Sequence, residues 1–207
     1  MSVPTVGFVM DSGHFIKYRA KLNLFTIALV SLVSSISWSK TYTVTNKSTL
    51  GFSIYKFKIG APVKGKFKKF KANIDFDIKT WTVGSVWALI NVDSIDTGKA
   101  KRDKKLREDV DFFNTKKFKE ITFISNKSVI VQKNRTVEVK GDLTIKKITR
   151  PVTLYLVYQG LIGDAHKFKV TGLIDRKLWK ITWNKVMDVG GFVLGDEVNI
   201  ELELWAK

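Results

Sequence analysis

Apolar and polar residues alternate along most of the chain beyond residue 40, as expected of β-strands that bury one face and expose the other. The alternation is most regular in residues 137–146, where valine, glycine, leucine and isoleucine alternate with charged residues and threonine. The same pattern recurs at short spacing in residues 49–57, 63–67, 72–78, 152–158, 168–174 and 198–204. A series of about eight short strands predicts an all-β sandwich or barrel.

Residues 93–125 interrupt this pattern and contain the only good candidate for a helix. Leu106 and Val110 lie four residues apart and would share one helical face, and an aromatic pair, Phe112 and Phe113, follows them. We expect a short helical excursion between central strands that packs against one edge of the sheet and leaves its charges in water.

Two strands depart from simple alternation. In residues 63–78 the apolar side changes parity after Phe67, which predicts a β-bulge near residues 68–70. Residues 86–92 are apolar on both faces, so we expect the helix or its aromatic pair to cover their outer side.

Three predicted strands place a glycine on the apolar face, and these glycines are Gly65, Gly141 and Gly172. Glycine weakens a strand, so each of them can mark a bend or a corner of a barrel. Alternatively, the missing side chains leave room for a ligand, because an eight-stranded barrel is just wide enough to be filled or to hold one small ligand. The sequence leaves both interpretations open.

Residues 17–39 have the order of a secretory signal peptide, with basic residues first, then an apolar run at 24–33, then small residues. The run is about ten residues long, whereas a membrane-spanning helix needs roughly twenty, which favours cleavage over an uncleaved anchor. With Ser37 and Ser39 as the small residues before the cut, residues 1–39 form an N-terminal extension and signal peptide, and residues 40–207 form the mature domain.

The predicted mature domain is strongly basic. The chain has 36 Lys and Arg against 19 Asp and Glu, and residues 1–39 hold three basic residues and one acidic residue, which leaves 33 against 18, a net charge of +15. Such a charge suits nucleic acid, an anionic membrane surface or simple solubility. Export argues against a nucleic-acid partner, because the two would occupy different compartments.

Candidate catalytic groups are scarce. His166 is the only histidine beyond residue 40, where we expect it to be solvated in a loop, and the chain has no cysteine, so zinc, haem and thiol sites have no ligand set. The carboxylate pairs Asp75/Asp77 and Glu201/Glu203 fall on polar strand faces, where solvated charges are expected. No GxSxG, P-loop or dinucleotide-binding motif occurs. The sequence therefore argues against an enzyme.

An ordered set of motifs carries a family resemblance. DSIDT stands at 93–97, RD at 102–103, DFF at 111–113 and ITFIS at 121–125, and GDLTI at 141–145 and TRPVTL at 149–154 follow. With VKGKF at 63–67 and GDEVNIELEL at 195–204, this set resembles the YceI-like family from residue 42 to residue 204. The resemblance implies an antiparallel lipocalin-like β-barrel, exported to the periplasm, that encloses a long-chain isoprenoid or similar amphiphile.

The candidate site combines both arguments, since alternation assigns the inward face and the resemblance supplies the ligand class. The residues expected to line the interior are Phe52, Ile54, Phe67, Phe76, Ile90, Phe123, Gly141, Leu143, Leu154, Phe168 and Ile174. Arg102 is a candidate for the ligand's polar head, because arginine can make a forked contact to phosphate. The alternative is that Arg102 and Asp103 pair with groups at strand ends.

The sequence thus predicts a periplasmic binding protein that sequesters or transports a long-chain isoprenoid or fatty lipid, with no cofactor other than that lipid. An exported adhesion or stress module that holds no ligand and binds anionic membranes through its basic surface is the alternative.

Overall fold

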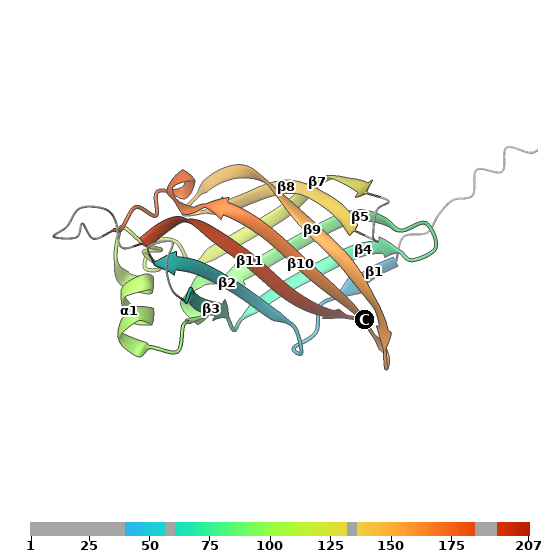
Figure 1. Cartoon of the computed structure of the whole chain (residues 1–207), viewed down its shortest axis with the longest axis horizontal. Coiled ribbons are helices and arrows are strands. Elements are labelled where there is room, and N and C mark those ends of the chain that lie inside the picture. Colours follow the sequence, from blue (N-terminus) through green and yellow to red (C-terminus); the bar gives the residue numbers. More distant parts are fainter. Residues whose placement is uncertain (1–39, 57–60, 132–135, 185–193) are drawn as a thin grey trace, which may run out of the picture. The chain divides into compact units, whose positions relative to one another are not determined.

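The computed structural model describes residues 40–56, 61–131, 136–184 and 194–207, and these form one antiparallel sheet of 11 strands (Figure 1). The strands are β1 (Lys40–Thr43), β2 (Thr49–Lys56), β3 (Val63–Phe67), β4 (Phe70–Asp77), β5 (Thr82–Asn91), β6 (Ile95–Asp96), β7 (Glu120–Val131), β8 (Thr136–Ile145), β9 (Ile148–Ile162), β10 (Ala165–Asp175) and β11 (Leu194–Ala206). Within these ranges the helices are α1 (Ala100–Glu108) and two short 3-10 helices, η2 (Val92–Ser94) and η4 (Arg176–Trp179).

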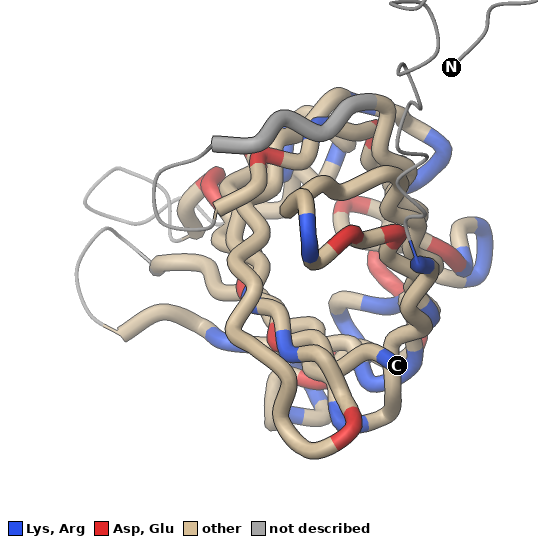
Figure 2. Tube along the Cα trace, turned by 90° about the vertical axis from the view of Figure 1, so that its right-hand side faces the viewer, with Lys and Arg blue, Asp and Glu red and all other residues tan. Residues whose placement is uncertain are grey.

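The sheet closes on itself. Its strand order is β1-β4-β5-β7-β8-β9-β10-β11-β2-β3-β6, and β3 and β4, near opposite ends of this order, are separated along the chain only by Lys68 and Lys69. Strand β11 pairs with β2, and the backbones of Thr43 and Lys207 hydrogen-bond to each other beside β1. The trace therefore runs round a central axis, which Figure 2 views from one end.

Three of the barrel's strands are interrupted, which explains why the structure has 11 strands where the sequence predicts about eight. The run from β3 to β4 is one strand with a kink at Lys68 and Lys69, where the bulge was predicted. Likewise β5 continues through η2 into β6, and β1 and β2 both lie beside β11. Counting each pair once gives eight strands, so the predicted lipocalin-like barrel is confirmed.

The helical excursion is confirmed, but its details differ from expectation. Helix α1 ends at Glu108, so Val110 lies beyond it and is 66% exposed, while Leu106 packs against the core. Trp87 on the outer side of β5 is 37% exposed, because Phe112 and Phe113 pack at one end of the barrel and do not cover that strand. The sequence shows that these apolar residues need partners, but not which surface supplies them.

The predicted N-terminal extension and signal peptide, residues 1–39, lie outside the described residues. Among the helices of the described ranges, none is both long enough and apolar enough to span a membrane.

Candidate ligand-binding cavity

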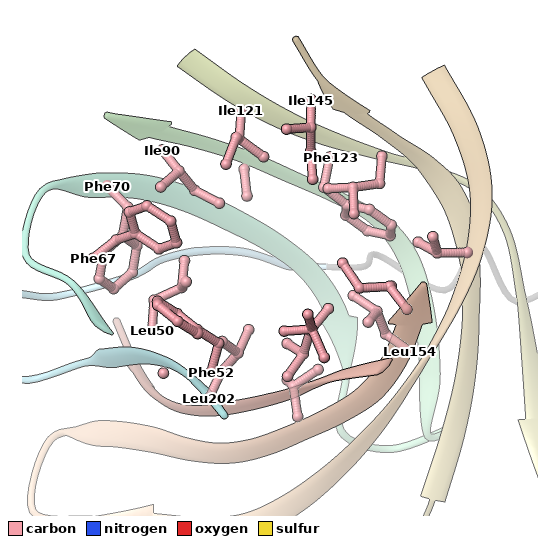
Figure 3. Close-up of a pocket in the computed structure, with 18 of the residues that line it drawn as sticks. Leu50, Phe52, Phe67, Phe70, Ile90, Ile121, Phe123, Ile145, Leu154 and Leu202 are labelled. Atoms are coloured by element: carbon pink, nitrogen blue, oxygen red, sulfur yellow. The ribbon is translucent and has the colours of Figure 1, made fainter. Parts of the chain in front are cut away.

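The barrel contains a cavity of about 210 Å³ (Figure 3). Its wall takes apolar side chains from β2, β3, β4, β5 and β7 to β11, and Arg176 is the one charged residue among the described residues that line it. In Figure 3, Ile90, Ile121, Phe123 and Ile145 lie on one side of this space, and Leu50, Phe52, Leu154 and Leu202 lie on the other. The period-two alternation of the strands produces this wall, since every second side chain points inward.

Most of the residues predicted from alternation line this cavity. Eight do so: Phe52, Ile54, Phe67, Ile90, Phe123, Leu143, Leu154 and Ile174. The structure therefore brings together side chains from seven strands that are distant in sequence. Their contact with a ligand stays a prediction.

Phe76 and Phe168 point inward but are not among the lining residues, which corrects their assignment to the cavity wall. Their ring centroids are 5.3 Å apart, and both pack against Tyr158, at 5.4 and 5.3 Å. Trp81 joins this aromatic cluster at 6.0 Å from Phe76. The cluster fills one end of the barrel. Alternation predicts the face of a strand but not the height of a residue along the barrel axis.

His166 belongs to the same end and is half-buried on β10, so the expectation of a solvated loop residue is wrong. Its Nδ1 lies 2.9 Å from the Tyr158 hydroxyl, and the Tyr42 ring lies edge-on at 4.5 Å. Burial lowers the pKa of His166, and nearby Lys40 lowers it further. Burial also raises the pKa of Tyr158, with a smaller contribution from Tyr42, so the phenol keeps its proton and can donate it to a neutral imidazole.

The space over each inward glycine is occupied, which corrects the interpretation that Gly141 leaves room for a ligand. A Cβ atom on Gly141 would lie 2.7 Å from Cε2 of Phe123 and 2.6 Å from the carbonyl oxygen of Ile124. A ring of Phe52 lies in the same way over Gly65, and Leu154 lies over Gly172. These contacts depend on the register of neighbouring strands, which a single strand's pattern does not contain.

Arg102 has the structural role that was the alternative to head-group binding. Its Nε donates to Oγ1 of Thr97 and its Nη2 to the Thr97 carbonyl, both at 2.7 Å, and it is not among the residues that line the cavity. Asp103 is buried and accepts a hydrogen bond from the Thr97 amide at 2.9 Å. Together they tie the start of α1 to the end of β6.

Arg176 was not predicted from the sequence. It is 2% exposed and donates to the carbonyls of Gly195, Ile181 and Trp183 at 2.9, 2.6 and 2.9 Å. Its Nη2 also lies 3.4 Å from a carboxylate oxygen of Asp196. Burial lowers the pKa of Arg176, and Asp196 and Asp175 oppose that shift. The only sign of this role in the sequence is the position of Arg176, which directly follows a predicted strand and lies where the alternation of apolar and polar residues stops.

The cavity is capped at the α1 end by the segment that follows this helix. Leu106, Phe112 and Phe113 contribute to the lining, and Phe112 stacks on Trp183 with centroids 5.3 Å apart. The Asp111 carbonyl accepts hydrogen bonds from the amides of Thr182 and Trp183. The cap therefore joins two segments that are distant in sequence.

No group of three or more metal-ligating side chains occurs within the described ranges. With an apolar wall, and with the hydrogen bonds of Arg176 directed at the backbone and Asp196, the arrangement suits the uptake of hydrocarbon and offers no evident nucleophile or general base.

Comparison with known proteins gives three kinds of similarity. The YceI-like domain family matches residues 42–206. A UPF0312 protein of Staphylococcus aureus (strain USA300) is 35% identical over 160 residues, which cover 74% of this chain and 89% of that protein. A UPF0312 protein of Staphylococcus epidermidis (strain ATCC 35984) is 34% identical over the same shares of the two chains.

Solved structures are also similar. BcnA of Burkholderia cenocepacia has a TM-score of 0.67 and 27% identity, covering 78% of this chain and 97% of that one. A Campylobacter jejuni YCEI protein has a TM-score of 0.58 and 28% identity, covering 74% and 90%. A polyisoprenoid binding domain from Saccharophagus degradans has a TM-score of 0.58, covering 82% and 98%, and its 15% identity makes it a match of fold alone.

Proposed function

The chain belongs to the YceI-like family, and from this premise we propose that it is a binding protein that holds a long-chain isoprenoid or similar amphiphilic lipid inside its barrel. The observation that carries the proposal is the cavity of about 210 Å³ inside the barrel, with its apolar wall. The Saccharophagus degradans domain, which shares the fold, is a polyisoprenoid binding domain and offers a precedent.

The energetics of the cavity favour hydrocarbon. Moving a CH₂ group out of water contributes about 0.8 kcal/mol, so a chain of several isoprene units gains affinity without any polar contact. A void of about 150 Å³ lined by leucine, isoleucine and phenylalanine stays dry and binds benzene in another protein. This cavity is larger and has the same kind of lining. A polar head group gains nothing from such a wall, so it would remain at an end of the barrel.

Catalysis has no support in this arrangement, and the proposed role is binding. Sequestration and transport both fit, because each needs only a reversible transfer of a chain between water-excluded sites. The pattern of residues 17–39 supports export to the periplasm. N-terminal sequencing of the exported protein should start within a few residues of Lys40, and an intact chain confined to the cytoplasm would contradict export.

A cavity-filling variant tests the binding site. Ala88 lines the cavity and pairs in register with Ala72 and Phe123, so an aromatic ring attached there would occupy part of the cavity. We expect delipidated wild-type protein to bind diphenylhexatriene and to release it when geranylgeraniol is added. We expect Ala88→Phe to bind neither compound and to have a melting temperature close to that of the wild type. Leu89→Phe, on the other face of the same strand, is the matched control. Full geranylgeraniol binding by Ala88→Phe would contradict a site in this cavity.

A second role, contact with anionic membranes, is favoured by the hairpin between β9 and β10. Leu161 and Ile162 at its tip are 59% and 50% exposed. Two lysines lie beside it: Lys167, which pairs with Glu203, and Lys207, which pairs with Asp164. Exposed apolar residues next to lysines are typical of segments that touch an anionic bilayer. Membrane contact and lipid binding are compatible, because a carrier has to meet the membrane that supplies its ligand.

A further inference from the structure

We propose that Gly65, Gly141 and Gly172 set the width of the cavity, each by letting one side chain of the neighbouring strand lie flat against the wall, and that this width admits methyl-branched chains. We call these three residues the seat glycines. The inference rests on the proposed function, since it explains how the same cavity selects an isoprenoid chain over a straight one.

The pair Phe52 and Gly65 shows the geometry most clearly. The two residues are register partners on β2 and β3, and the ring lies directly over the glycine. A Cβ atom on Gly65 would lie 2.9 Å from both Cε atoms of Phe52 and closer still to Cζ. No backbone atom is among its three nearest neighbours, so the ring alone uses the space that the missing side chain leaves.

The other two seat glycines repeat this arrangement at separate places on the wall. Leu154 pairs in register with Gly172, and its Cδ2 would lie 2.6 Å from a Cβ there. Phe123 leans diagonally over Gly141, since it pairs with Leu143 and its Cε2 would lie 2.7 Å from a Cβ on Gly141. All three seated side chains line the cavity. The positions of these three side chains therefore set the width of the cavity at three different strand pairs.

An alanine at a seat glycine would push the seated side chain inward. Ordinary carbon–carbon contacts are about 3.5 to 4.0 Å, so the ring of Phe52 would have to move by roughly 1 Å toward the cavity. A straight chain tolerates such narrowing better than a chain with methyl branches, which has a larger cross-section. Apolar pockets typically discriminate against one misfitting methyl or methylene by roughly 10- to 200-fold.

Rings packed over glycines also stabilise sheets without any ligand, which is the structural alternative. Under that alternative, a substitution would lower stability and weaken the binding of every chain alike. The two explanations therefore predict different changes in selectivity between branched and straight chains, whereas the melting temperature does not distinguish them.

The best variants are Gly65→Ala and Gly172→Ala, because a Cβ on Gly141 would also lie 2.6 Å from the Ile124 carbonyl oxygen and strain the backbone. The probes are geranylgeraniol and hexadecanol, whose main chains are equally long; geranylgeraniol also carries the methyl branches and double bonds of an isoprenoid chain. We expect each variant to lose geranylgeraniol affinity by roughly tenfold or more while hexadecanol affinity changes much less. Phe52→Ala combined with Gly65→Ala removes the displaced ring and should restore geranylgeraniol binding.

Gly51→Ala is the matched control. The backbone of Gly51 borders the cavity, but its register partners, Lys66 and Glu201, are exposed. A Cβ there would lie 3.0 Å from the Glu201 carbonyl oxygen, so the added methyl group would strain β2 and would point away from the cavity. Equal losses for both alcohols in Gly65→Ala, as in Gly51→Ala, would overturn the inference. If wild-type protein takes up neither alcohol, the proposed function fails, and a crystal structure of Gly65→Ala decides the inference. A Phe52 ring moved into the cavity supports it, and a ring left in place overturns it.

Discussion

Arg176 places a buried charge in a wall that is otherwise apolar, and its contacts explain how that is tolerated. Three carbonyl oxygens, from Ile181, Trp183 and Gly195, surround its guanidinium, and Asp196 balances its charge. Five N–H donors in a planar fork suit this arrangement better than the single ammonium of lysine. We infer that Arg176 fixes residues 181–183 to the start of β11 and so holds the cap end of the cavity.

Arg176→Met should therefore lower the free energy of unfolding by roughly 3 kcal/mol or more, because it leaves three carbonyl oxygens without donors. Arg176→Lys should recover only part of this loss. Denaturant unfolding of the three proteins gives the measurement. A methionine variant as stable as wild type would show that the apolar replacement compensates for the lost hydrogen bonds.

His166 gives the aromatic end of the barrel a pH dependence with a defined sign. The pKa of this imidazole is lowered in the folded chain, first by burial and then by Lys40, so the unfolded chain, with an ordinary value of 6.5, binds the proton more readily. The free energy of unfolding should be fully retained above pH 6.5 and should fall as the pH drops below it.

His166→Phe keeps a ring against Tyr42 but cannot be protonated. We expect its melting temperature to fall less steeply than that of wild type as the pH is lowered below 6.5. Thermal melts across that range, with both proteins in the same buffers, provide the comparison. Parallel curves would mean that carboxylates elsewhere, and not His166, set the acid sensitivity.

Single positions show how far sequence reasoning reaches. Alternation correctly placed Phe52, Leu143 and Ile174 on the cavity wall, because inward direction is a local property of a strand. It misplaced Phe76, because depth along the barrel depends on the tilt and stagger of all strands together. The seat glycines were found, but their occupants depend on register between strands, which no single strand reveals.

Among the elements, α1 and the segment after it form the cap of the cavity. Phe113 lines the cavity and contacts the ring of Phe67 with centroids 6.1 Å apart, whereas Val110 in the same segment is exposed. The opposite end is filled by the aromatic cluster of Phe76, Trp81, Tyr158 and Phe168. A chain should therefore enter and leave past the cap.

Phe113→Ala should speed the release of a bound chain. Loss of a fully buried ring removes about 1.5 to 3 kcal/mol of apolar burial, and if half of that is lost from the barrier, release becomes roughly 3- to 13-fold faster. Stopped-flow transfer of diphenylhexatriene from protein to vesicles measures the rate, with Val110→Ala as the control. Equal rates in all three proteins would place the exit elsewhere.

Some features of the helices and strands follow from the local sequence, and others depend on contacts with distant residues. A helix in residues 93–125 was predictable from the loss of alternation, and α1 lies there. Its start was not predictable, because Lys99 occupies the cap position without a side-chain hydrogen bond. The nearby carboxylate of Asp103 instead accepts a hydrogen bond from the Thr97 amide. The kinks that turn eight strands into 11 were predictable only at residues 68–70, where parity changes visibly.

For the whole molecule, residues 40–207 carry a net charge of +15, on which the proposed contact with anionic membranes depends. Alternation alone could not separate a sandwich from a barrel, because both bury one face of each strand. The barrel was predicted from the family resemblance. The structure explains it by the kinked run from β3 to β4: β3 pairs with β2 and β6, and β4 pairs with β1 and β5, so this run joins the two ends of the sheet.

If the lysines attract anionic bilayers, binding to vesicles containing phosphatidylglycerol should weaken steeply as salt rises above the physiological range. Replacing both Leu161 and Ile162 by asparagine should weaken it further, because their exposed side chains would no longer insert. Vesicle co-sedimentation at several salt concentrations tests both effects. Binding that ignores salt would leave the charge as a feature of solubility.

Native mass spectrometry of the gently purified, full-length protein tests the central claim most directly. We expect a major species that carries one apolar molecule, released by organic solvent with the mass of a long-chain isoprenoid or similar lipid, and we expect Ala88→Phe to lack it. A wild-type protein that is free of any adduct, and that stays free after incubation with geranylgeraniol, would contradict the account.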